Sequence, residues 1–71
     1  MGTKNNPGAF DCYTKAGPDE PIFTLRANDP LAPDAVEDWA LAYEARGGDK
    51  AKVDEALNCA HQMRVWRKEN C

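Results

Sequence analysis

Residues 33–66 have the sequence PDAVEDWALAYEARGGDKAKVDEALNCAHQMRVW, in which apolar side chains recur at helical spacing on both sides of a Gly-Gly pair. Pro33 suits the first turn of a helix, because its φ is already helical and a first-turn residue needs no N–H. Gly47-Gly48 interrupts the pattern, and Asp49 is a good N-cap for a second helix. The two apolar stripes are Val36, Trp39, Ala40 and Tyr43, then Val53, Ala56, Leu57, Ala60, Met63 and Trp66. The sequence therefore predicts two helices joined by a tight turn.

The residues before Pro33 predict strands. Residues 9–15 and 22–27 alternate between two faces, which is the pattern of half-buried strands. Residues 16–21, AGPDEP, are dense in turn formers, so we expect the strands to pair as an antiparallel hairpin. Residues 1–8 are polar, and we expect a flexible arm there, followed by one small domain over residues 9–71. The predicted fold class is α+β: an N-terminal antiparallel β-hairpin followed by an αα-hairpin, in the order ββαα.

The chain is short and acidic, with 71 residues, a net charge of −3 and 42% hydrophobic residues. This charge is unlike that of a general nucleic-acid coat protein, and we expect no direct nucleic-acid binding. No stretch approaches the ~20 apolar residues that span a bilayer. Three cysteines, an odd number, are unlike the disulfide framework of a small secreted domain. We therefore expect a cytoplasmic protein without a membrane partner.

The small size of the chain also bears on its assembly. A two-stranded sheet is marginal by itself, and two short helices would cover only one of its faces. We therefore expect a homo-oligomer, in which a second copy supplies the missing burial. The alternative is a monomer held by an aromatic cluster. Its members would be Phe10, Phe23, Trp39, Tyr43 and Trp66.

Basic and aromatic residues near the end of the second helix are candidates for binding an anionic ligand. His61, Arg64 and Lys68 share one side of a helix, with Arg67 close by, and such cationic donors suit a phosphate group. Trp66 is placed to stack a base beside them. The alternative is structural, because basic side chains favour the last turn of any helix and a tryptophan often anchors a core or an interface.

Acidic residues gather at the start of the first helix, and residues 28–46 carry a net charge of −4. Asp34, Glu37 and Asp38 would complement a basic surface, either on a partner protein or at the end of the second helix in another copy. The same charges are typical of a solvated helix that follows dipole preferences. The pattern alone leaves both interpretations open.

The single histidine limits the chemistry that the chain can perform. Cys12 or Cys59 would need His61 as a base and a third group to orient it. A zinc site would combine His61 with the three cysteines, but Cys59 and His61 are two residues apart and point in different directions on a helix. The sequence has no phosphate-binding loop and no metalloprotease pattern. We therefore expect no enzyme, no metal and no cofactor.

Short motifs in the first half resemble a family of short uncharacterised proteins from tailed bacteriophages. These motifs are Asp11-Cys12-Tyr13, Pro18-Asp19-Glu20-Pro21 and Asp29-Pro30. In the second half the resemblance extends to Trp39-Ala40, the stretch from Ala56 to Met63, and Trp66. The resemblance carries no known activity. The family tends to have an arginine directly before its Asp-Pro pair, where this chain has Asn28, and Arg26 lies two residues earlier on the same side of an extended segment.

Small phage proteins without enzyme motifs often bind and block, and host immunity is a frequent target. We therefore expect a small inhibitory binding protein of host defence that works without catalysis in the host cytoplasm. It would sequester a nucleotide-like anionic signal, with Arg26 or Arg64 on the phosphate and Tyr13 or Trp66 stacking the base. One alternative is a protein-directed inhibitor, similar to an anti-CRISPR, whose acidic helix covers a host defence protein. Another is a phage assembly accessory protein.

Overall fold

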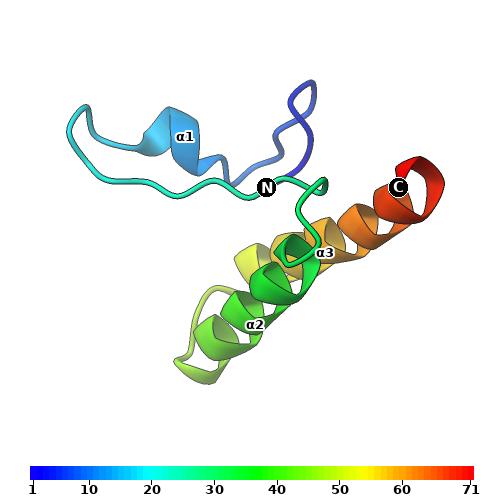
Figure 1. Ribbon diagram of the computed structural model, residues 1–71. Coiled ribbons are helices and arrows are strands. Elements are labelled where there is room, and N and C mark those ends of the chain that lie inside the picture. Colours follow the sequence, from blue (N-terminus) through cyan, green and yellow to red (C-terminus); the bar gives the residue numbers. More distant parts are fainter.

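The computed structural model describes all 71 residues, and its regular structure is entirely helical. α1 spans Cys12–Lys15, α2 spans Ala32–Ala45 and α3 spans Lys50–Asn70. α2 and α3 pack side by side as a hairpin, while the chain before α2 lies on one side of it and α1 extends away (Figure 1). No helix is both long enough and apolar enough to span a bilayer.

α2 begins and ends where local sequence signals place it. It starts one residue before Pro33, so the missing N–H of this proline falls in the first turn and costs no helical bond. At the other end Gly47 has a φ of 81°, and its N–H donates to the carbonyl of Glu44 (2.9 Å). The N–H of Gly48 donates to the carbonyl of Tyr43 (3.0 Å). Together these bonds form a Schellman motif, which satisfies the last carbonyls of the helix. The predicted helix and its end at the Gly-Gly pair are confirmed.

Asp49 caps α3, as the sequence predicts. Its carboxylate accepts a hydrogen bond from the N–H of Ala51 (2.9 Å), one of the donors that the first turn leaves without a helical partner. Arg67 and Lys68 lie in the last turn, where positive charge is favourable next to the negative end of the helix dipole. A side-chain cap therefore defines the start of the longest helix, and favourable charges stabilise its end.

Small side chains form the core between α2 and α3. Seven of the 71 residues are buried, and Val53 is the largest side chain that is completely buried. The buried residues are Ala32, Pro33, Ala40, Val53, Ala56, Cys59 and Ala60. Because the distance between two packed helices depends on the side chains at their contact, alanines let α2 and α3 approach closely. The hairpin is therefore held by close packing of small groups.

Most of the aromatic side chains are exposed, and Phe10 and Tyr43 are half-buried. Phe23 is 83% exposed, and Trp39 and Trp66 are 43% and 42% exposed. Trp39 stacks on Tyr43, with ring centroids 4.9 Å apart and an interplanar angle of 10°. The aromatic cluster of the monomer alternative is therefore not formed within one chain.

The predicted β-hairpin is wrong, so the fold is all helical and not α+β in the order ββαα. Residues 9–15, the expected first strand, contain α1 instead. The Asp11 carboxylate accepts from the N–H of Tyr13 (3.3 Å) and from the hydroxyl of Thr14, and these bonds cap one helical turn. Residues 22–27, the expected second strand, lie outside any helix or strand. Once the first segment forms a turn of helix, the second has no neighbour with which to build a ladder.

Candidate functional site

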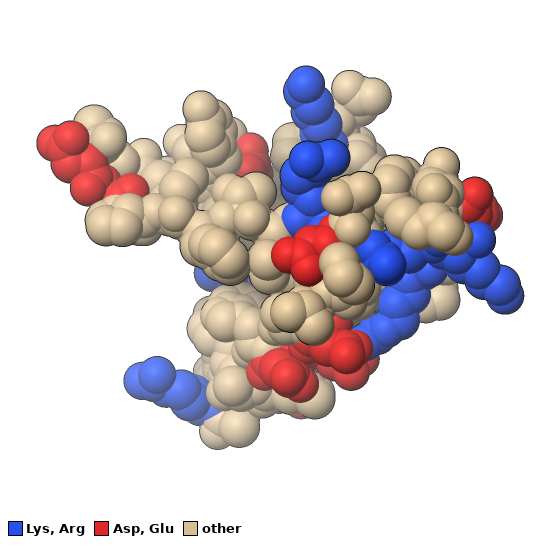
Figure 2. Space-filling model, viewed as in Figure 1, with Lys and Arg blue, Asp and Glu red and all other residues tan.

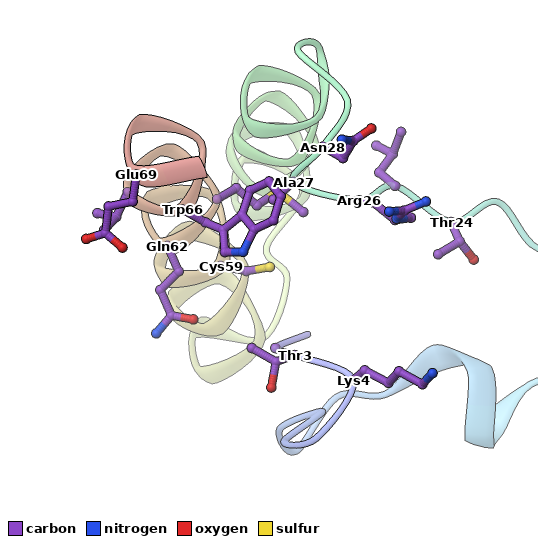
Figure 3. Close-up of a pocket in the computed structure, with 14 residues that line it drawn as sticks. Thr3, Lys4, Thr24, Arg26, Ala27, Asn28, Cys59, Gln62, Trp66 and Glu69 are labelled. Carbon is purple, nitrogen blue, oxygen red and sulfur yellow. The ribbon is translucent and has the colours of Figure 1, made fainter. Parts of the chain in front are cut away.

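A cavity of about 620 Å³ lies where three parts of the chain meet (Figure 3). One wall comes from residues 2–4, the other from residues 24–28, and α3 provides the floor. Small-molecule sites have volumes of ~300–1,000 Å³, so this cavity has room for a ligand the size of a mononucleotide. It is the candidate functional site.

The floor of the cavity is one face of α3. Cys59, Gln62, Met63 and Trp66 line it, and their spacing of three, four and seven residues places them on the same side of the helix. Trp66 is 42% exposed, and its indole lies at the centre of the view in Figure 3. Burial raises the pKa of the Cys59 thiol, which keeps it protonated and unreactive. The floor therefore offers an aromatic surface and no activated nucleophile.

The N-terminal wall is held to α3 by Glu55. The N–H groups of Ala9 and Phe10 donate to the two oxygens of its carboxylate, each at 2.9 Å. The amino group of Met1 donates to the carbonyls of Pro7 (2.8 Å) and Phe10 (2.7 Å), and also to Oε2 of Glu55 (3.2 Å). The hydrogen bond from Ala9, helped by that from Phe10, lowers the pKa of Glu55, because both favour the charged carboxylate.

Gly8 is required where the wall meets this carboxylate. Its φ is 83°, a region that side chains disfavour. A Cβ on Gly8 would also come within 2.8 Å of Oε1 of Glu55. A glycine therefore lets the backbone pass directly over the carboxylate.

The second wall is held to α3 by Arg67. Nη1 of its guanidinium donates to the carbonyls of Ala27 (3.1 Å) and Asn28 (2.8 Å). The chain then turns into α2, since the N–H of Asp29 donates to the carbonyl of Arg26 (2.9 Å). These bonds place the Arg26 side chain among the lining residues of the cavity.

The charged groups of the cavity favour an anion. Lys4 belongs to one wall and Arg26 to the other, while Glu69 is the one carboxylate among the lining residues. Hydroxyl and amide groups that can form hydrogen bonds come from Thr3 and Gln62, among others. Cationic walls beside an exposed indole suit a ligand that combines negative charge with a planar ring.

The structure brings together two of the four ligand residues proposed from the sequence. Arg26 and Trp66 line the same cavity, although forty positions separate them in the sequence. Tyr13 lies on α1, is 76% exposed and does not line the cavity. Arg64 is also outside it, engaged with acidic residues of α2. Sequence reasoning missed Lys4, because nothing near Lys4 in the sequence shows that Glu55 holds this part of the chain.

The acidic residues proposed for partner binding differ in what they contact. Nη2 of Arg64 lies 2.9 Å from Oδ1 of Asp34, and Nη1 lies 3.3 Å from Oε2 of Glu37. Asp38 forms no ion pair. The hydrogen bond to Asp34, followed by that to Glu37, raises the pKa of Arg64. Figure 2 shows acidic and basic side chains side by side on this part of the surface, where Arg64 pairs with two of the four acidic residues of α2.

The cysteines and the histidine do not form a metal centre. The structure has no group of three or more His, Cys, Asp or Glu side chains arranged to hold a metal ion. All three cysteines are free: Cys59 is buried, and Cys12 and Cys71 are exposed.

No protein-family model, no curated protein and no solved structure matches this chain.

Proposed function

We propose that this protein is a non-catalytic binding protein that takes a nucleotide-like anionic ligand in the cavity above α3. The observation that carries the proposal is the position of Trp66 and Arg26, which line one cavity from distant parts of the sequence. Trp66 would stack the base, and such stacking contributes roughly 1–3 kcal/mol per base in nucleic-acid complexes. Arg26 would bind the phosphate through paired hydrogen bonds, and Lys4 would add a second positive charge.

The ligand would be sequestered and released unchanged, since the proposal includes no bond-making or bond-breaking step. The biological setting that we propose, inhibition of host defence by a phage protein, is supported by the motif resemblance described above. In that setting the protein would lower the free concentration of a nucleotide signal. Its effect would therefore depend on its abundance relative to the signal, as for any stoichiometric binder.

We also propose that the protein works as a homo-oligomer. Its accessible surface is 5540 Å², whereas a compact monomer of 7.9 kDa exposes about 4,400 Å². The excess of about 1,100 Å² compares with the ~800 Å² that each partner buries in a standard interface. Ile22 and Phe23, 43% and 83% exposed, lie in the segment that leads to the cavity wall and would be covered by a second copy.

The test of the ligand proposal is a panel of mono-, di- and cyclic nucleotides. Binding would raise the melting temperature, since a ligand at 100 times its Kd stabilises the native state by ~2.7 kcal/mol. In a Trp39→Phe background Trp66 is the remaining tryptophan, and its fluorescence should be quenched by the same nucleotides that raise the melting temperature.

Arg26→Ala should weaken binding, and Arg46→Ala is its matched control, because Arg46 is exposed at the end of α2 away from the cavity. If the whole panel leaves the melting temperature and the fluorescence unchanged, the nucleotide proposal is wrong. A protein-directed inhibitor would then be the better hypothesis. It predicts salt-sensitive binding to a host protein that Asp38→Lys weakens.

A further inference from the structure

The N-terminal wall of the cavity is half-buried at Met1 and Phe10 and exposed between them. Residues 2–9 are exposed, and none belongs to a helix. Their connection to α3 runs through Glu55, which accepts hydrogen bonds from the N–H groups of Ala9 and Phe10. A charged acceptor makes these bonds stronger than bonds between neutral groups. Glu55 is therefore the residue of α3 that makes the hydrogen bonds to the segment carrying Thr3 and Lys4.

The opposite wall has the reverse arrangement. Arg67 donates to the carbonyls of Ala27 and Asn28, so a cationic side chain of α3 holds the backbone oxygens of the segment that carries Arg26. Most of residues 22–28 are exposed, and they pair with no strand. Glu55 of α3 thus accepts hydrogen bonds from the N-terminal wall, and Arg67 of α3 donates hydrogen bonds to the second wall.

The two anchors lie at opposite ends of the cavity floor. The α3 residues that line the cavity run from Cys59 to Glu69, with Glu55 about one turn before the first of them and Arg67 near the last. Twelve residues of α-helix correspond to about 18 Å, which is the separation of the two anchors along the axis of α3. In Figure 3 the segment that carries Arg26 lies to the right of the Trp66 ring and Thr3 and Lys4 lie below the ring, with the Lys4 side chain extending away from it.

We propose that Glu55 and Arg67 are positioning residues that hold the two walls over the Trp66 floor, and this inference rests on the proposed function of the cavity. Neither side chain needs to touch the ligand. Their loss would release a wall and leave the α2–α3 hairpin folded, because neither residue belongs to the buried core. The chain would then keep its helices and lose its site.

The experiment measures how accessible Trp66 is, with no ligand present. In the Trp39→Phe background we would compare Glu55→Gln and Arg67→Gln by acrylamide quenching of the remaining tryptophan. Trp66 is now 42% exposed, so release of a wall can raise its quenching constant by up to about twofold. Glu44→Gln and Arg46→Gln are the matched controls, since both residues are exposed in or next to α2 and neither side chain holds a wall. Circular dichroism should show unchanged helicity in all four variants.

The outcomes separate the inference from the proposed function. Higher quenching in both anchor variants, with controls unchanged, supports the inference even if no nucleotide in the panel binds. If the panel identifies a ligand, the anchor variants should also weaken its binding with no loss of helicity. Unchanged quenching in both anchor variants would overturn the inference even if a nucleotide binds the parent protein. Loss of helicity in both would overturn it as well, because the two residues would then hold the hairpin and not the walls.

Discussion

Val53→Ala should cost the protein a large part of its stability. Val53 is the largest side chain in the core that is fully buried, and it lies where α3 packs on α2. The substitution removes two buried methyl groups, each contributing about 0.8 kcal/mol. With the cavity that remains between two closely packed helices, the total loss is about 2–3 kcal/mol. The total free energy of unfolding of a chain of this length is about 4–10 kcal/mol.

Val65→Ala is the matched control, since it makes the same change on the same helix. Val65 is 42% exposed, so its loss should cost below about 1 kcal/mol. Urea unfolding followed by circular dichroism measures both variants at one protein concentration, because association would make stability depend on concentration. With a slope of ~1 kcal/mol per molar urea, Val53→Ala should lower the unfolding midpoint by about 2 M. Equal midpoints for the two variants would refute the assignment of the core to this contact.

Three further predictions concern the turn, the cap and the N-terminal wall. Gly48→Ala should destabilise the hairpin by about 1 kcal/mol in thermal melts, because its Cβ would overlap the Tyr43 ring and disturb the stack of that ring on Trp39. Gly17→Ala is the control: its Cβ would meet nothing closer than 3.8 Å, so the melting temperature should not change. Asp49→Ala should cost about 1 kcal/mol by removing the N-cap of α3, and Asp49→Ser should restore most of it in the same assay. The folded-state pKa of Glu55 lies below its ordinary value of 4.5. The hydrogen bonds from Glu55 to the N-terminal wall should therefore be complete above pH 4.5 and be lost as the pH falls through the lower, folded-state pKa. Acrylamide quenching of Trp66 should rise in acid as a result. In Glu55→Gln this acid-induced change should be absent, and a full-sized change there would contradict the role of Glu55.

The helical half of the fold could be predicted because its signals are local. Pro33, the Gly-Gly pair and Asp49 each act on the backbone within a few residues, through a fixed φ, a positive φ and a side-chain cap. None of these effects requires knowledge of a distant contact. The positions of the helix ends therefore follow from short stretches of sequence.

The first half could not be predicted in the same way, because two local signals compete there. Residues 9–15 alternate as a strand does, but Asp11 is also an N-cap with Thr14 three positions later. A cap acts within a single turn, whereas a strand needs a partner elsewhere in the chain. Since no partner strand forms, the local cap prevails and the alternation has no consequence.

The candidate site shows the same division between local and distant information. The place of Trp66 next to a basic helix end suggests a ligand role from sequence, and Arg26 does so through its chemistry. Their meeting in one cavity depends on hydrogen bonds that span about forty residues, from Arg67 to the wall that carries Arg26. In the sequence Arg64 is as suitable a phosphate ligand as Arg26, yet in the structure it forms ion pairs with Asp34 and Glu37 across the hairpin.

This architecture separates the interactions that stabilise the hairpin from those that hold the cavity walls. The α2–α3 hairpin is held by alanine packing, the Asp49 cap of α3 and a Schellman turn, and none of these interactions involves the cavity walls. The walls depend on a few charge-assisted hydrogen bonds from exposed backbone, so the free energy needed to open them is small compared with that needed to unfold the helices. A ligand that bridges Trp66, Arg26 and Lys4 would add contacts to both walls at once. Binding would therefore order the walls far more than the hairpin, and part of the binding free energy would be spent in closing them.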